Sequence, residues 1–153
     1  MRLRLPAELA KYLYEALRKA GNKEIGGQLY GEQLAPSDFR VTEITFQKRP
    51  GTFARFVVDL VQAACDATGF FNRTGHRYAR FNYIGEWHSH PSFDVQPSGT
   101  DIAAMRDLVR DHEFQGNFAI LLITRIYQGK IIAGSWLFDP SGREQTVNLE
   151  FEL

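Results

Sequence analysis

The sequence is organised around Ile84-Gly-Glu-Trp-His-Ser-His-Pro-Ser-Phe-Asp-Val-Gln-Pro-Ser-Gly-Thr-Asp101. If residues 84–90 form a strand, its two-residue period places the side chains of His88 and His90 on one face. Neutral imidazoles and a carboxylate such as that of Asp101 are ligands that zinc accepts in a tetrahedral site. Three protein ligands leave a fourth position open, as is typical of catalytic zinc. The spacing therefore predicts a catalytic site with one zinc per chain.

The third ligand is expected at the start of a helix. Pro91 ends the strand because proline cannot donate a ladder hydrogen bond, and the loop as far as Pro97 leads to a helix that begins at Ser98. Asp101 then lies in the first helical turn. Ser98 and Asp101 also match a capping box, which is the more common explanation for such a pair taken alone. Both roles are compatible, since a capped first turn holds a ligand rigidly.

Two other carboxylates, Glu86 and Asp94, lie close to the histidines in the sequence. Glu86 shares strand parity with His88, so it competes as a ligand or as a catalytic base. The side chains of opposite parity have different expected roles. Trp87 is expected to pack in the core, and Ser89 to fix the ligand geometry through hydrogen bonds.

The motif resembles the signature of the JAMM metalloprotease family, also called MPN-plus or JAB-domain proteins. It reads His88-Ser-His-Pro91, then six residues, then Ser98-x-x-Asp101. Every position of that signature is filled. Five fixed residue types at fixed spacing would arise by chance roughly once in 10⁵ chains of this length. Zinc-dependent isopeptidases that remove ubiquitin and ubiquitin-like proteins belong to this family, and the chain resembles its compact bacterial members.

The family also has a glutamate on an upstream strand, and Glu24-Ile-Gly-Gly-Gln-Leu-Tyr-Gly31 is similar to that segment. The resemblance implies that Glu24 takes a proton from water and returns it to the leaving amine. It also implies that the Ser98 hydroxyl donates to the tetrahedral oxyanion. Gly26 and Gly27 weaken a strand, so their presence indicates a bulge or a close approach of another backbone.

The resemblance implies a zinc isopeptidase or peptidase that hydrolyses the bond after the C-terminal glycine of a ubiquitin-like modifier. The expected setting is deconjugation of target proteins in a bacterial conjugation system, with antiphage defence as the best guess for context. The modifier, its conjugates and the matching activating and conjugating enzymes are the implied partners. Residues 26–31 and the loop 91–97 are expected to flank a groove in which the modifier's tail pairs with a strand edge.

Two alternatives remain open. One is a peptidase that processes a ubiquitin-like precursor or a sulfur-carrier adduct. The other is a non-catalytic scaffold subunit, which ranks last because scaffold members of this fold lack the ligands that this chain has. The sequence places no catalytic partner next to Cys65 that would make it a protease nucleophile. Cys65 is therefore expected to be a small buried apolar residue.

The composition of the chain indicates one domain over residues 1–153, with 44% apolar and 13% aromatic residues for its core. Eighteen basic and eighteen acidic residues balance, so no overall charge points to nucleic acid or to an anionic membrane. No apolar run has the length of a membrane span. A single cysteine excludes an intrachain disulfide and a Cys-rich zinc site, and a reducing cytoplasm is the expected compartment.

Apolar periodicity and turn residues predict an α+β domain with a mixed central sheet flanked by helices. The resemblance implies the JAMM/MPN fold, with a layering like that of cytidine deaminases. The expected strands span residues 2–5, 25–34, 39–47, 56–58, 81–90, 118–123, 131–138 and 146–151. Three helices are expected. The first runs from Pro6 to Gly21 and the third from Ser98 to near Gly116. The second begins after an N-cap at Asp59, and its inner face consists of Leu60, Ala64, Cys65, Thr68 and Phe71.

Overall fold

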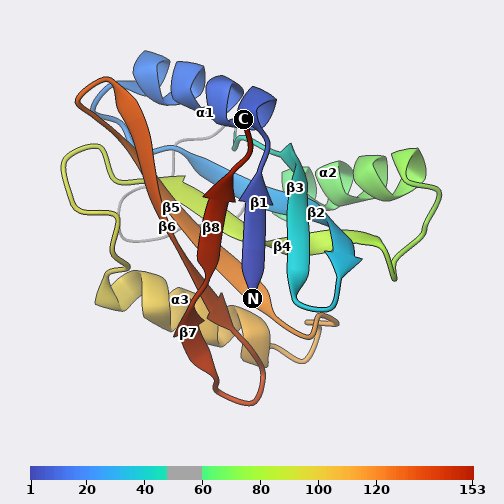
Figure 1. The fold of residues 1–153 in the computed structure, drawn as a ribbon. Helices are drawn as coiled ribbons and strands as arrows, with labels where there is room; N and C mark the ends of the chain where they lie inside the picture. Colours follow the sequence, from blue (N-terminus) through green and yellow to red (C-terminus); the bar gives the residue numbers. More distant parts are fainter. Residues whose placement is uncertain (48–59) are drawn as a thin grey trace.

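The computed structural model describes residues 1–47 and 60–153. This part forms one mixed eight-stranded sheet in the order β7-β6-β5-β4-β2-β3-β1-β8, flanked by three helices (Figure 1). The α+β class and the mixed sheet predicted from the sequence are confirmed. The elements are β1 (Arg2–Leu5), α1 (Ala7–Ala20), β2 (Gly26–Ala35), β3 (Asp38–Ile44), α2 (Leu60–Arg73), β4 (Phe81–Ser89), α3 (Gly99–Arg110), β5 (Ala119–Tyr127), β6 (Lys130–Phe138), β7 (Glu144–Thr146) and β8 (Asn148–Phe151).

The sheet carries a separate apolar cluster on each face. On one face, α1 buries Leu13 and Leu17 in a cluster that includes Trp87 of β4. On the other face, α3 buries Met105 in a cluster with Leu121 of β5. Each fully buried large side chain contributes roughly 1.5–3 kcal/mol to folding. The second cluster fixes α3 against β5 and β6, next to β4, which is the arrangement on which the candidate site depends.

The buried face of α2 differs from the predicted one. Phe70 is 3% exposed and packs on Tyr30 of β2, with ring centroids 4.6 Å apart. Ala64, Cys65 and Thr68, which were predicted to share the inner face, are exposed. Burying an aromatic ring removes more apolar area from water than burying alanine or cysteine. The helix is therefore turned toward Phe70, and the prediction of a buried Cys65 is wrong.

Helix α3 ends at Arg110, one and a half turns before the predicted end near Gly116. Asp111 leaves the helix with ψ of 136°, and its carboxylate accepts a hydrogen bond from the Glu113 backbone N–H at 2.7 Å. An aspartate side chain that bonds to the backbone two residues ahead forms a turn in place of a further helical turn. The predicted strand 56–58 and the predicted N-cap Asp59 lie outside the described residues.

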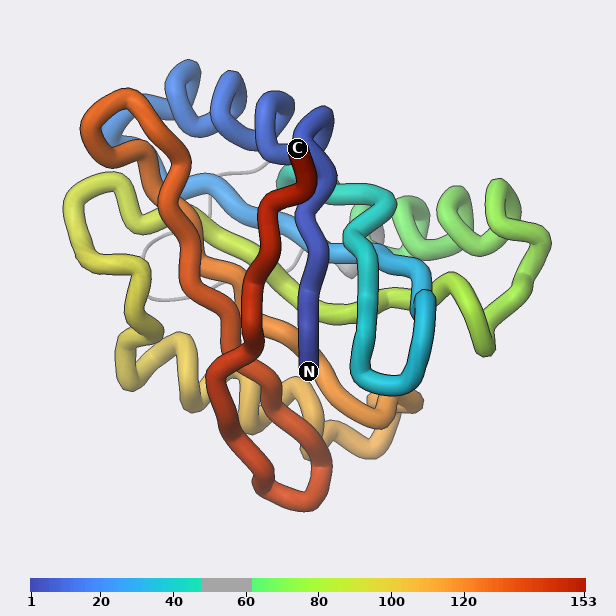
Figure 2. Tube along the Cα trace, viewed as in Figure 1, coloured from blue at the N-terminus to red at the C-terminus, as the bar shows by residue number. Residues whose placement is uncertain are grey.

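The predicted C-terminal strand is two strands, which separate at Val147. β7 pairs with β6, whereas β8 pairs in parallel with β1 at the other end of the strand order. Between them, the Val147 N–H donates to the carbonyl of Ser135 and the Ser135 hydroxyl donates to the carbonyl of Val147. Figure 2 shows the first and last strands side by side. No helix among the described residues has the length and hydropathy needed to span a membrane.

Two glycines allow the close contacts between strands that hold β4 in place. A Cβ atom on Gly85 would lie 1.9 Å from the carbonyl oxygen of Ile120, and the φ of Gly85 is +149°, which side chains disfavour. A Cβ atom on Gly27 would lie 2.0 Å from the carbonyl oxygen of Thr45. That same oxygen accepts a hydrogen bond from the buried Trp87 indole at 2.9 Å. The close backbone approach predicted for the glycine pair is therefore found at Gly27.

Candidate metal centre

The end of β4 and the first turn of α3 bring three potential metal ligands together. The Nε2 atoms of His88 and His90 are 3.0 Å apart. Asp101 places its Oδ1 3.4 Å from Nε2 of His88 and its Oδ2 3.6 Å from Nε2 of His90. The two histidine side chains are 12% and 9% exposed, so the group lies just below the surface. The three residues predicted as ligands thus form one group of potential ligand atoms.

The distances within this group suit a tetrahedral ion. With zinc–ligand bonds of about 2.0–2.1 Å, neighbouring ligand atoms of a tetrahedron lie about 3.3–3.4 Å apart, close to the three separations observed. The orientation of His90 suits a ligand as well. Its Nδ1 lies 2.8 Å from the carbonyl oxygen of Asp94, and because a carbonyl can only accept, Nδ1 carries the proton. The lone pair of Nε2 therefore points into the group, as in known zinc sites.

Asp101 is held in place by the capping box that the sequence predicted. The backbone N–H and the hydroxyl of Ser98 both donate to Oδ2 of Asp101 at 2.7 Å, and the Asp101 N–H donates to Oγ of Ser98 at 3.1 Å. Burial alone would raise the pKa of Asp101. Hydrogen bonds from His88 and Ser98 outweigh that effect and hold the pKa well below its usual range. Asp101 is therefore an ionised carboxylate at neutral pH, as a metal ligand must be.

Glu24 precedes β2 and interacts electrostatically with the same group. Its Oε1 atom is buried and has no hydrogen-bond partner among the described residues. Burial raises the pKa of Glu24, and the charges of His88 and His90 oppose that rise while that of Asp101 adds to it. All three candidate ligands are therefore within electrostatic reach. A buried carboxylate oxygen without a protein partner is uncommon and needs an explanation, which a bound metal or substrate would supply.

Ser89 fastens the segment that carries Glu24 to β4. The Ser89 hydroxyl accepts a hydrogen bond from the Ile25 N–H at 3.0 Å, and the Ser89 N–H donates to the Ile25 carbonyl at 2.8 Å. The sequence predicted that Ser89 would fix the geometry of the ligands. Its hydrogen bonds instead fix the residue next to Glu24, and so the distance between that carboxylate and the histidines.

The two rival carboxylates lie elsewhere. Glu86 is 7% exposed, accepts a hydrogen bond from the Tyr83 hydroxyl at 2.6 Å, and is absent from the group of converging ligand atoms. Burial raises the pKa of Glu86 to about 8. The side chain of Asp94 is 93% exposed, and only its backbone carbonyl reaches His90. The geometry therefore favours Glu24 over both as the carboxylate that works with the ligand group.

The strand at Gly26 has no free edge for a peptide. β2 pairs with β4, where Gly26 is the partner of His88. On its other side, the Gly26 carbonyl accepts from the Gln47 N–H at 2.9 Å and the Gln28 carbonyl accepts from the Thr45 N–H at 3.0 Å. The backbone carbonyls of Gly26 and Gln28 are therefore already bonded, so a modifier tail that pairs with a strand edge, as the sequence predicts, would need a different strand.

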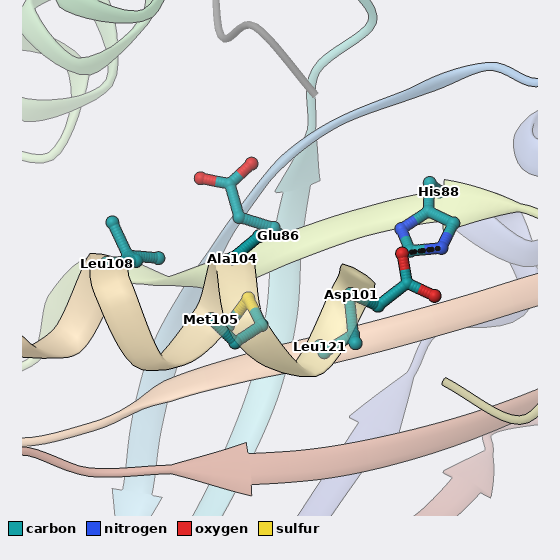
Figure 3. A pocket seen from close by; sticks show the side chains of 7 residues that line it. All are labelled: Glu86, His88, Asp101, Ala104, Met105, Leu108 and Leu121. Atoms are coloured by element: carbon teal, nitrogen blue, oxygen red, sulfur yellow. Dashed lines mark ion pairs between the residues drawn. The ribbon is translucent and has the colours of Figure 1, made fainter. Parts of the chain in front are cut away.

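A cavity of about 110 Å³ adjoins the ligand group. His88 and Asp101 form one end of it, so that a bound molecule could reach both the cavity and the ligands (Figure 3). The rest of the lining comes from α3 and from β4 and β5. The lining residues are Glu86, His88, Asp101, Ala104, Met105, Leu108 and Leu121.

Arg125, which the sequence did not single out, holds the loop that orients His90. Its guanidinium donates to the carbonyl of Phe93 at 2.9 Å and lies 3.8 Å from the carboxylate of Asp94. The next carbonyl along, that of Asp94, is the one that orients His90. The only signal in the sequence was a charged residue two positions after the apolar run 118–123, which is too common to be informative.

Arg125→Met is expected to weaken zinc binding by roughly 10–100-fold, the usual cost of losing a group that orients a metal ligand. Methionine keeps the apolar stem but cannot hold the Phe93 carbonyl. Competition against a chromophoric chelator measures the affinity. Arg143→Met is the matched control, since Arg143 pairs with Asp139 at 3.0 Å in the turn after β6. Equal zinc affinities of the two variants would show that Arg125 is not needed to orient His90.

Comparisons with known proteins identify the family and the fold of the chain. A family described as prokaryotic homologs of the JAB domain matches residues 6–138. No curated protein sequence matches the chain. A solution structure of a protein from Desulfitobacterium hafniense has a TM-score of 0.65 at 18% identity, covering 98% of this chain and 92% of that one. A solution structure of a Salinibacter ruber protein has a TM-score of 0.55 at 16% identity, covering 99% and 92%.

The two solved structures support the fold, and the family match extends over both the Glu24 segment and the histidine motif. The resemblance found in the sequence is thereby confirmed. The chain belongs to the prokaryotic JAB-domain family.

Proposed function

We propose that the chain is a zinc-dependent isopeptidase that hydrolyses the bond after the C-terminal glycine of a ubiquitin-like modifier and so removes the modifier from target proteins. A bacterial ubiquitin-like conjugation system, such as one used in antiphage defence, is the proposed setting. One observation carries the proposal: three converging potential zinc ligands lie within electrostatic reach of a buried carboxylate oxygen that has no protein partner.

His88, His90 and Asp101 would hold the zinc. When bound there, zinc supplies Lewis acidity, which polarises a carbonyl and makes water more acidic. Glu24 accepts the proton that water loses and delivers it to the leaving amine, and its raised pKa suits a group that both takes and gives a proton. Ser98 bonds to Asp101 in the free protein. Its hydroxyl would turn toward the oxyanion as negative charge develops there.

The two alternative functions make different demands on the same residues. A peptidase that processes a modifier precursor or a sulfur-carrier adduct would use this chemistry unchanged on a different leaving group. A scaffold subunit would need neither the convergence of the ligands nor the buried oxygen of Glu24. These features favour a catalytic role over a scaffold.

Three substrates separate these functions: an isopeptide conjugate of a ubiquitin-like modifier, a modifier precursor with a C-terminal extension, and a peptide of the tail alone. Zinc-loaded protein is expected to cleave the conjugate fastest. The tail peptide should be slow, because affinity comes mainly from the surface of the folded modifier. Faster cleavage of the precursor would support processing. Equal turnover of conjugate and tail peptide, or cleavage of none, would refute the proposal.

A further inference from the structure

Among the described residues, the cavity beside the metal centre is lined by an apolar wall and, outside the ligand group, by the acidic residue Glu86. The apolar wall consists of Ala104, Met105 and Leu108, which recur at helical spacing along α3, and of Leu121 from β5. Glu86 lines the cavity from β4 (Figure 3). None of the described lining residues is a lysine or an arginine. A molecule that fits this lining would be largely aliphatic and would carry a hydrogen-bond donor or a positive charge.

Glu86 has an unused hydrogen-bonding position in this wall. The residue is 93% buried, and its Oε1 atom accepts from the Tyr83 hydroxyl at 2.6 Å. Gln28, the cross-strand neighbour of Glu86 on β2, also lowers the pKa of this carboxyl through a side-chain hydrogen bond. The Oε2 atom itself is buried and has no partner within hydrogen-bond distance among the described residues. A buried polar atom without a partner destabilises the free protein, so a ligand that donates to Oε2 recovers stability that the free protein lacks.

We propose that this cavity is a substrate subsite for a lysine-like side chain, with the aliphatic stem against α3 and the primary amine at Glu86. The inference rests on the proposed hydrolase function, since it places the side chain next to the bond that is cut. A cavity of about 150 Å³ accommodates benzene, so 110 Å³ suits a slender chain of a few methylenes. The glycines of a modifier tail have no side chain to occupy it.

The first test uses small probes and does not depend on turnover. n-Butylammonium copies the lysine side chain, and n-butyrate has a similar chain with a negative group at its end. The titration uses the zinc-free protein, in which no metal can bind the butyrate carboxylate. With n-butylammonium it is expected to shift the methyl NMR signals of Met105 and Leu108 with a dissociation constant in the millimolar range. Butyrate is expected to bind at least tenfold more weakly. Equal shifts from both probes, or none from either, would overturn the proposal.

Variants locate the binding. Ala104→Leu fills the cavity from an exposed helical position and is expected to weaken butylammonium binding more than tenfold. Ala103→Leu, at the neighbouring exposed position outside the lining, is the matched control and should leave binding unchanged. Glu86→Gln keeps the shape but replaces one acceptor oxygen by an amide NH2 group, which only donates, and is expected to weaken binding about tenfold. Unchanged binding in Ala104→Leu would place the probe elsewhere and reject the subsite.

The lysine-like side chain could belong to the modifier tail or to the target protein. Lys-Gly-Gly copies a lysine in the modifier tail, and Gly-Gly-Lys copies a lysine of the target beyond the tail. Only the peptide whose lysine lies on the cavity side of the glycine pair can fill the cavity and reach the zinc at the same time. That peptide should compete with butylammonium at lower concentration. If the protein cleaved the conjugate but did not bind butylammonium, the subsite alone would be rejected. Probe binding by a protein that cleaves no conjugate would reject the isopeptidase function and leave an amine-binding site.

Discussion

Glu24→Gln is expected to lower kcat by roughly 10²–10⁴-fold while the protein keeps one zinc per chain. Glutamine preserves the size of the side chain but cannot carry a proton between water and the leaving amine. The carboxylate lies within electrostatic reach of the candidate ligands and has a buried oxygen without a partner among the described residues. The loss should therefore fall on the chemical step, with little change in zinc content or in the melting temperature.

Conjugate cleavage under saturating substrate measures this loss, with zinc content determined on the same sample. Glu113→Gln makes the same chemical change at a side chain that is 84% exposed and distant in sequence from the ligand motif, so it should retain full activity. If Glu24→Gln remained active while Glu86→Gln lost turnover, the assignment of the catalytic carboxylate would have to be reversed.

Alanine in place of His88, His90 or Asp101 is expected to reduce bound zinc from one equivalent to almost none. Each substitution leaves only two protein ligands, and the affinity of a zinc site depends on its complete set of protein donors. Asp101→Ala also removes the capping box, which costs about 1 kcal/mol. Asp101→Asn therefore accompanies it as a variant that retains a side chain able to cap the helix.

Elemental analysis of purified protein, alongside circular dichroism, separates loss of metal from loss of fold. His76→Ala is the control. His76 bonds to Asn72 and Tyr78 at the end of α2 rather than to the ligand group. Full zinc in all three ligand variants would mean that the metal binds elsewhere.

Local patterns were sufficient to predict the convergence of the ligands. The parity of His88 and His90 follows from the strand period, and the Ser98–Asp101 capping box fixes the first turn of α3. These features depend on residues only two or three positions apart. Glu24 lies far away in the sequence, and only the family resemblance indicated it.

Long-range contacts could not be read from local patterns. Arg125 reaches a carbonyl 32 residues away, and nothing near it in the sequence shows that this carbonyl belongs to the loop that orients His90. The rotation of α2 had a similar cause. Its inner face was settled by the ring of Tyr30 on β2 rather than by the spacing of Ala64 and Thr68.

The parallel pairing of β1 with β8 has a consequence for the order of folding. It joins Arg2 to Asn148, so this part of the sheet can close only when almost all the residues between them have been synthesised. Contacts between residues so distant in sequence form slowly, because chain closure must precede the gain from pairing. The β4–β5 pairing and the first turn of α3 lie within residues 81–127. We expect the metal centre to assemble during synthesis on the ribosome, whereas the pairing of β1 with β8 forms last.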